Sequence, residues 1–216
     1  MLFEPAAFKN IDNEYEKIKN EKEAKKPNIE ITDETTISAA RRLVVDEGVS
    51  ETVCLNFASA KNPGGGFLTG SQAQEESLAR SSGLYLSISQ KNEMYDYNRG
   101  IKTCLYSDYM IYSPKVPVFR DDNNKLLNEA FLVSFITAPA VNAGVVRERE
   151  KENLEKIHSV MLDRIKKILL VAALNDNKAI VLGAYGCGFL RTKQRMLQSI
   201  LERYCMKMVT KEFLIE

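Results

Sequence analysis

The chain has 216 residues, of which 44% are hydrophobic and 27% charged, and its formal net charge is +1. These values are ordinary for a soluble globular protein and give no electrostatic reason to expect general nucleic-acid binding. No apolar run approaches the roughly 20 residues that span a bilayer, and the N-terminus lacks the pattern of a secretory signal. We therefore expect a cytoplasmic monomer without membrane contact.

Histidine and cysteine usage argues against a metal site. The chain has one histidine, His158, and four widely spaced cysteines without a C-x-x-C pair. Zinc sites need several such ligands at short spacing, so we expect no metal and no cofactor. A single histidine in a polar stretch also argues against a Ser/His or Cys/His hydrolase.

The N-terminal stretch differs in character from the rest of the chain. Residues 10–26 are charged and helix-prone, and Pro27 ends that helix. Residues 29–32 alternate in polarity, which indicates a short strand. We therefore predict a helical extension over residues 1–34 and one main domain over residues 35–216.

A helix over residues 34–46, capped by Asp33 and ended by Gly48, is predicted next. Residues 52–58 are then apolar and rich in β-branched side chains. This composition is typical of a central strand that is buried on both faces. Ligands of open α/β sheets bind at the carboxyl ends of such strands.

A run of three glycines, Gly64, Gly65 and Gly66, follows this strand. Without Cβ atoms the main chain can lie against a ligand, and consecutive N–H groups can form an anion-binding concavity. Seven residues separate Gly66 from Gln74. Ser71 and Gln74 fit the S-x-x-Q capping box, which predicts a helix with Ser71 as its N-cap.

Glu75 and Glu76 fall in the first turn of that helix, beside the glycine loop. Acidic residues are common there because they complement the helix dipole, but a carboxylate pair beside such a loop also suits proton transfer. A nucleotide P-loop is excluded, because Gly65 and Gly70 have the right spacing but Ser71 stands where lysine is required.

The later elements complete an α/β pattern. They are predicted as a polar loop over 91–100, strands over 105–112 and 116–119, a turn at 121–124, a strand over 131–138, a helix over 147–174 and a strand over 178–182. A second glycine loop with Gly186, Cys187 and Gly188 follows, and then a helix over 193–204. A loop of this kind before a helix is suited to holding a diphosphate. The alternation predicts three α/β/α layers around a mixed sheet.

The Gly-Gly-Gly run, its spacer and Gln74-Glu75-Glu76 resemble the motif of bacterial-type poly(ADP-ribose) glycohydrolases, which are macrodomain enzymes. The resemblance runs from about residue 35 to residue 188, with similar segments at 55–60, 112–122, 136–142 and 182–188. It implies a macrodomain fold and an enzyme that hydrolyses ribose–ribose O-glycosidic bonds, releasing ADP-ribose from poly(ADP-ribose) chains on modified proteins.

The resemblance also implies a role for each site residue. Glu76 is the acid/base, and Glu75 holds hydroxyls of the reacting ribose. The ligand-binding residues that it implies are Gly64, Gly65, Gly66, Gln74, Gly186, Cys187, Gly188 and Phe189. Adjacent helical residues point about 100° apart, so the two glutamates are not expected to flank the bond as in ordinary glycosidases, and one acid is expected to serve both steps.

The sequence departs from the family pattern after Gly188. Phe189 follows directly, and Leu190 stands where the family has an aromatic residue that helps to position the ribose. Two alternatives therefore stay open beside the polymer hydrolase. One is an ADP-ribose-binding macrodomain with little turnover, and the other is a hydrolase of single ADP-ribosyl units.

Overall fold

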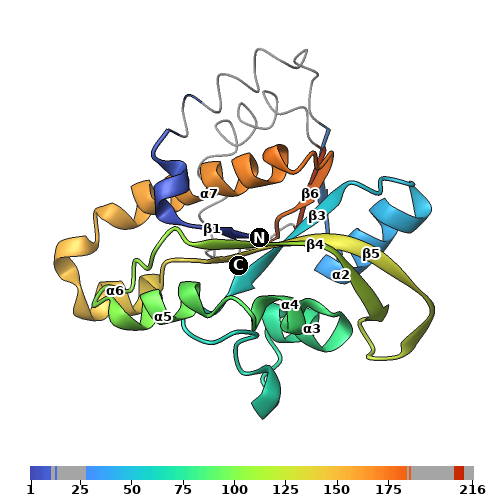
Figure 1. Cartoon of the computed structure of the whole chain (residues 1–216), viewed down its shortest axis with the longest axis horizontal. Helices are drawn as coiled ribbons and strands as arrows, with labels where there is room; N and C mark the ends of the chain where they lie inside the picture. Colours follow the sequence, from blue (N-terminus) through green and yellow to red (C-terminus); the bar gives the residue numbers. More distant parts are fainter. Residues whose placement is uncertain (11–12, 14–27, 184, 186–206, 212–216) are drawn as a thin grey trace.

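The computed structural model describes residues 1–10, 13, 28–183, 185 and 207–211. Within these ranges seven strands form one sheet in the order β1-β4-β5-β3-β6-β7-β2 (Figure 1). The strands are β1 Leu2–Phe3, β2 Ile29–Thr32, β3 Thr52–Ala58, β4 Met110–Arg120, β5 Leu126–Pro139, β6 Ala179–Val181 and β7 Lys207–Lys211. The sheet is mixed, because β4 runs antiparallel to β1 and β5 while the other pairs are parallel.

Helices cover both faces of this sheet. They are α2 Thr36–Arg41, α3 Gln74–Ser81, α4 Leu84–Ile88, α5 Asn92–Gly100, α6 Ala143–Arg149 and α7 Lys156–Leu174. Short 3-10 turns cover Pro5–Phe8, Phe67–Thr69 and Lys151–Asn153, and a π-helical turn covers Arg42–Asp46. Figure 1 shows α7 over one face and α3, α4 and α5 under the other. The three-layer α/β/α architecture is thereby confirmed.

The central strand β3 explains why two cores form. Its alternating side chains point to opposite faces. Val53 and Leu55 join the core beneath α7, whereas Cys54 joins the core formed with α2, α3, α4 and α5. All three are almost fully buried. The strand is therefore enclosed on both faces, as its apolar composition predicts.

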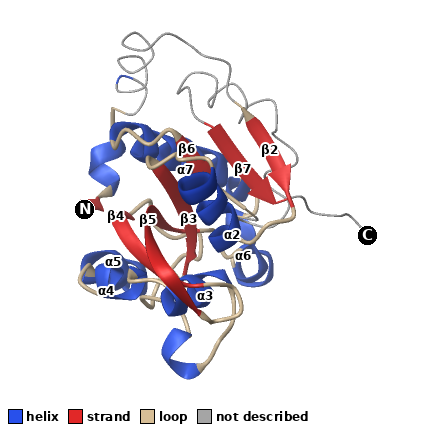
Figure 2. Cartoon of the chain, turned by 90° about the vertical axis from the view of Figure 1, so that its right-hand side faces the viewer, coloured by secondary structure: helices blue, strands red, loops and turns tan. Residues whose placement is uncertain are grey.

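Both edge strands of the sheet, β1 and β2, come from the N-terminal stretch. β1 pairs with β4, and β2 pairs with β7, as Figure 2 shows for the second pair. Two short segments of residues 1–34, β1 and β2, thus take part in the sheet, and the division of the chain at residue 34 stays a prediction. The helix predicted over residues 10–26 lies almost wholly outside the described residues, and the helix predicted over residues 193–204 lies entirely outside them.

The helix before β3 differs from its prediction. It begins one residue after Thr35, whose side chain accepts a hydrogen bond from the Ser38 N–H. Thr35 is therefore the N-cap, and the prediction of Asp33 was wrong. The helix continues into the π-helical turn, and Gly48 then adopts a φ of 70°. Glycine tolerates this left-handed conformation, which is why the chain turns there.

The stretch predicted as a polar loop is helix α5. Met94, Tyr95 and Asn98 lie on its buried face, and the Asn98 side chain donates to Met94 O and accepts from Ser107 N. The sequence did not indicate this buried face, because one of its three residues, Asn98, is polar.

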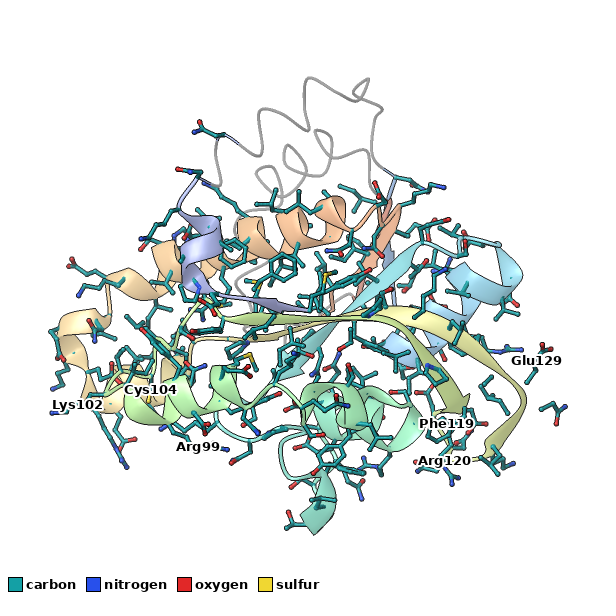
Figure 3. The ribbon with its side chains drawn as sticks, viewed as in Figure 1. Arg99, Lys102, Cys104, Phe119, Arg120 and Glu129 are labelled. Carbon is teal, nitrogen blue, oxygen red and sulfur yellow. The ribbon has the colours of Figure 1, made fainter. Side chains whose placement is uncertain are left out.

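The two strands predicted around Pro114 and Pro117 are one strand, β4. A register shift between Ser113 and Val116 accommodates Pro114 within the pairing to β5. Figure 3 shows Phe119, Arg120 and Glu129 at the end of this hairpin that lies away from Cys104. The proline positions therefore bend the strand without ending it.

The long helix predicted over residues 147–174 is interrupted. Glu150 has φ −130° and ψ 56°, which separates α6 from the turn that precedes α7. Its carboxylate accepts from Thr103 Oγ1, Cys104 N and Asn153 Nδ2. Two of these hydrogen bonds connect the break between α6 and α7 to Thr103 and Cys104, which precede β4. None of the helices in the described part of the chain has the length and apolar character needed to cross a membrane.

Candidate functional site

The first glycine loop leaves the carboxyl end of β3. Gly64 and Gly65 adopt φ values of 71° and 59°, which residues with a side chain rarely adopt. The turn is closed by hydrogen bonds from Gly65 N to Asn62 O and from Phe67 N to Gly64 O, both at 3.0 Å. The backbone geometry alone therefore explains two of the three consecutive glycines.

Close packing adds a second reason for Gly65 and the reason for Gly66, because two carboxylates and the Ser71 side chain lie against this turn. A Cβ atom on Gly65 would lie 2.3 Å from Glu76 Oε1 and 3.1 Å from Glu75 Oε2. A Cβ atom on Gly66 would lie 2.2 Å from Ser71 Oγ. The main chain of the loop and the carboxylates of α3 thus form one closely packed unit.

Helix α3 begins at Gln74, and its N-cap is Ala73, without a side-chain hydrogen bond. The predicted capping box was therefore wrong. Ser71 packs against Gly66 instead. The Gln74 amide reaches back to β3, where it accepts from Phe57 N at 2.9 Å and donates to Leu55 O at 2.8 Å.

Sheet topology explains this use of Gln74. Strand β6 pairs with β3 only as far as Cys54, so the next backbone groups on that side need other partners. The Gln74 amide supplies one acceptor and one donor, as a strand residue would. A third hydrogen bond from Gln74 Nε2 reaches Thr36 Oγ1 at 3.2 Å. Gln74 therefore fixes the start of α3 on the sheet, and its predicted contact with a ligand stays a prediction.

Glu75 is anchored within the protein through both carboxylate oxygens. Oε1 accepts from Asn56 Nδ2 at 3.3 Å, and Oε2 accepts from Ser59 N at 2.6 Å. The side chain is 3% exposed. Burial raises the pKa of Glu75 to about 7, and the charge of Glu76 adds to this rise, whereas the hydrogen bonds from Ser59 and Asn56 oppose it.

Glu76 is held through one oxygen only. Its Oε1 accepts from Gly66 N at 2.8 Å. Its Oε2 is buried and has no hydrogen-bond partner among the described residues. The two adjacent carboxylates therefore differ, because the described residues engage both oxygens of Glu75 but only one oxygen of Glu76.

One amide of the glycine loop binds one of the protein's own carboxylates. Gly66 N donates to Glu76 Oε1, and Gly65 N closes the turn by donating to Asn62 O. The hydrogen bond from Gly66 N therefore fixes Glu76 on the loop, and the predicted binding of a ligand by Gly64, Gly65 and Gly66 stays a prediction.

Sequence reasoning missed the residues behind Glu75. Asn56 lies in the middle of β3 and is fully buried, and its Nδ2 also donates to Thr137 Oγ1 on β5 at 3.2 Å. Ser59 supplies the main-chain donor. The signal available was one amide side chain within an otherwise apolar strand, since buried amides require partners.

The second glycine loop begins at the same edge of the sheet. Strands β3 and β6 are parallel neighbours, so their carboxyl ends lie side by side. Gly183 has a φ of 63°, and a Cβ atom there would lie 2.8 Å from Phe57 Cζ. The rings of Tyr185 and Phe57 are 5.8 Å apart. The predicted site residues Gly186, Cys187, Gly188 and Phe189 lie outside the described residues.

A family model for the catalytic domain of microbial-type poly(ADP-ribose) glycohydrolase matches residues 2–121. This match covers more than half of the chain. The chain belongs to this glycohydrolase family. The family's reaction is hydrolysis of glycosidic bonds in poly(ADP-ribose), so the chain is a glycoside hydrolase of that class.

Solved structures of bacterial poly(ADP-ribose) glycohydrolases are similar over nearly the whole chain. The Deinococcus radiodurans enzyme in complex with ADP-ribose is 42% identical, with a TM-score of 0.84, over 97% of this chain and 85% of that one. The Thermomonospora curvata enzyme is 38% identical, with a TM-score of 0.84, over 98% of this chain and 78% of that one. A comparison with curated protein sequences finds no match.

These similarities confirm the bacterial-type family and the macrodomain-like glycohydrolase fold that the sequence predicts. They leave the individual site residues as predictions. Within the described ranges, no three His, Cys, Asp or Glu side chains lie close enough together to hold a metal ion.

The free energy of unfolding of this glycohydrolase should depend on the protonation of Glu75. The folded-state pKa of about 7 lies above the ordinary value of 4.5, so the folded protein binds this proton more tightly than the unfolded chain. That stabilisation is present below the ordinary pKa and is lost as the pH rises through about 7. We expect the free energy of unfolding of Glu75→Gln, relative to wild type, to rise by about 2 kcal/mol between about pH 5 and about pH 8.

Urea denaturation of both proteins at the two pH values measures this difference. Glu93→Gln, in the exposed first turn of α5, is the matched control for the removal of one carboxylate, and the Glu75→Gln difference is compared with it. A difference between Glu75→Gln and wild type that stays constant with pH would contradict the assigned pKa.

The anchoring role of Gln74 gives a second prediction. Gln74→Ala leaves Leu55 O and Phe57 N without their side-chain partner, which should lower the free energy of unfolding by about 2 kcal/mol. The exposed Gln72→Ala is the control, and we expect it to stay within about 0.5 kcal/mol of wild type. Chemical denaturation of the three proteins measures this effect, and equal stability of both variants would exclude the anchoring role.

Proposed function

We propose that this chain releases ADP-ribose from poly(ADP-ribose) by hydrolysing ribose–ribose O-glycosidic bonds, with Glu76 as the acid/base. One observation carries the assignment. Glu76 is fixed by Gly66 N through Oε1, and its buried Oε2 lies without a hydrogen-bond partner from the described residues. A carboxyl group held in this way has one oxygen ready for a substrate atom.

The reaction follows from that oxygen. Protonated Glu76 gives its proton to the bridging oxygen as the bond from that oxygen to the ribosyl C1″ breaks. Positive charge develops on the ribosyl ring, and the nearby diphosphate of the substrate stabilises it. A water molecule then adds to C1″, and the Glu76 carboxylate takes the proton that this water loses. One water is consumed, and each fragment leaves with a hydroxyl group.

Glu75 supports the reacting ribose. Its carboxylate is fixed by Asn56 and Ser59, and it lies against the same glycine main chain as Glu76. In our proposal the ribose hydroxyls donate hydrogen bonds to this carboxylate, which orients C1″ toward Glu76. The second glycine loop then holds the diphosphate, since it leaves the neighbouring end of β6.

The proposal is supported by the ADP-ribose complex of the Deinococcus radiodurans enzyme, which covers 97% of this chain at 42% identity. We infer that ADP-ribose units, carried as chains on modified proteins, are the ligands of this chain as well.

The test uses the full chain and two substrates, poly(ADP-ribose) of defined length and a protein that carries single ADP-ribosyl units. Released ADP-ribose is measured for both, and ADP-ribose affinity is measured by calorimetry. We expect release from the polymer. Release only from the singly modified protein would support the mono-ADP-ribosyl hydrolase instead. Binding without release from either substrate would support the binding module.

A further inference from the structure

Arg164 is a fully buried charged residue that the proposed reaction does not use. It lies in the middle of α7 and is 1% exposed. Its guanidinium donates to Asp108 Oδ1 at 3.0 Å, and Asp108 also pairs with Lys167. Because Asp108 carries the compensating charge, the remaining donors of Arg164 are available for main-chain carbonyls.

These donors gather three carbonyl oxygens from two separate segments. Nη1 donates to Leu105 O at 3.1 Å and to Pro139 O at 3.0 Å, and Nη2 donates to Tyr106 O at 3.1 Å. Pro139 ends β5 and pairs with Ala58 at the end of β3. The segment before β4 reaches the same sheet edge because β4 runs antiparallel to β5. Arg164 therefore joins segments at the edge from which the glycine loops leave.

Tyr185 meets Arg164 at one of these carbonyls. Its hydroxyl donates to Pro139 O at 2.8 Å, and its side chain is 1% exposed. Tyr185 follows Gly183 in the turn after β6, and both residues contact the Phe57 ring. The Pro139 carbonyl therefore links this turn to β5, and Phe57 links it to β3.

The connection continues to the acid-bearing helix. Phe57 N donates to the Gln74 side chain, and Glu75 and Glu76 follow Gln74 in α3. The turn that opens the second glycine loop is thus connected through Phe57 to the helix that carries both acids. The hydrogen bond from Tyr185 to Pro139 O connects the same turn to β5.

We propose that Tyr185 and Arg164 are positioning residues for ligand binding, which fix the turn after β6 against the wall formed by β3 and α3 through the Pro139 carbonyl. The inference rests on the function proposed above. It extends that function to two buried side chains that touch neither the substrate nor the reacting atoms. If Glu75 holds the ribose, a displaced turn that no longer supports Phe57 and the start of α3 weakens binding in the ground state and the transition state alike.

The experiment compares Tyr185→Phe with Tyr112→Phe in the full chain. Both replacements remove one buried hydroxyl within the same core. The Tyr112 hydroxyl accepts a hydrogen bond from Asn177 Nδ2 at 3.2 Å. Asn177 lies just before β6, whereas Tyr185 lies after the other end of that strand. We expect Tyr185→Phe to raise the Kd for ADP-ribose and the KM for polymer about fivefold, with kcat within about twofold. Tyr112→Phe should leave all three within about twofold.

Arg164→Lys is the second variant. Lysine keeps a positive charge beside Asp108 but lacks the planar fork that reaches several carbonyls. Tyr185 and Arg164 both donate to Pro139 O. The fold increase in Kd for ADP-ribose in the double variant should therefore be smaller than the product of the fold increases in the two single variants. Should Arg164→Lys not fold, the comparison of the two tyrosine variants decides alone.

The outcomes separate this inference from the proposed function. If wild type binds and releases ADP-ribose while Tyr185→Phe matches Tyr112→Phe, the positioning role is overturned and the function stands. A loss in kcat at unchanged KM also overturns it, because positioning of the bound ligand acts on affinity. If wild type neither binds nor releases ADP-ribose, both the function and this inference fail.

Discussion

Gly65→Ala should lower kcat on poly(ADP-ribose) by at least about 100-fold while the protein stays folded. The new Cβ would lie 2.3 Å from Glu76 Oε1, the end of a flexible side chain. The clash is therefore relieved by moving the carboxylate rather than the backbone. In our proposal turnover is lost because Glu76 leaves the position from which it protonates the glycosidic oxygen.

The matched control for this variant is Gly48→Ala. Gly48 has a φ of 70°, close to the 59° of Gly65, but a Cβ atom there meets nothing within 4 Å. Both variants should lose about 1 kcal/mol of unfolding free energy from backbone strain, and only Gly65→Ala should lose turnover. Steady-state kinetics and urea denaturation on the three proteins measure both quantities. Unchanged kcat in folded Gly65→Ala would show that the carboxylate does not depend on the bare main chain.

Glu76→Gln should lower kcat by about 1,000-fold and keep the affinity for ADP-ribose within about threefold. Glutamine preserves the shape of the side chain, and its carbonyl oxygen can still accept from Gly66 N. It cannot donate and recover a proton as a carboxyl group does. Single-turnover release of ADP-ribose and calorimetric titration on the same preparation measure the two effects.

Glu93→Gln is the control for a glutamate near a helix start, because Glu93 lies exposed in the first turn of α5. It should match wild type in both assays. Substantial polymer hydrolysis by Glu76→Gln would remove this residue from the mechanism, and lost ADP-ribose binding would assign it to affinity instead.

The parts of the fold that the sequence predicts well are those where one physical requirement dominates. β3 was predicted with its observed bounds, 52–58, because a strand buried on both faces needs apolar residues throughout. The sequence places the glutamates in the first turn of the helix after the glycine loop, which is correct although the capping box behind that prediction was wrong. The bend at Gly48 follows from the conformational freedom of glycine.

The predictions that failed depend on contacts between distant segments. Gln74 fits a local capping box, but its amide bonds to the main chain of β3, which satisfies buried groups that sequence spacing does not show. Pro114 remains inside β4 because β5 pairs around it with a register shift. Glu150 interrupts the predicted long helix because it binds Thr103 and Cys104.

The difference between the two glutamates also needed the structure. Sequence indicates two neighbouring acids, and the helical period separates their directions. Only the positions of Asn56 and Ser59 show that Glu75 is engaged through both oxygens while Glu76 is engaged through one. That asymmetry supports giving the proton-transfer role to Glu76 and the ribose-holding role to Glu75.

The most direct measurement compares wild type, Glu75→Gln and Glu76→Gln on two substrates: poly(ADP-ribose) and an ADP-ribosyl nitrophenyl glycoside whose leaving group needs no proton. If Glu76 protonates the leaving oxygen, the rate loss of Glu76→Gln should be at least about tenfold smaller on the nitrophenyl substrate than on the polymer. The rate loss of Glu75→Gln should be alike on both. Equal losses of Glu76→Gln on the two substrates, or a leaving-group dependence in Glu75→Gln instead, would contradict the account.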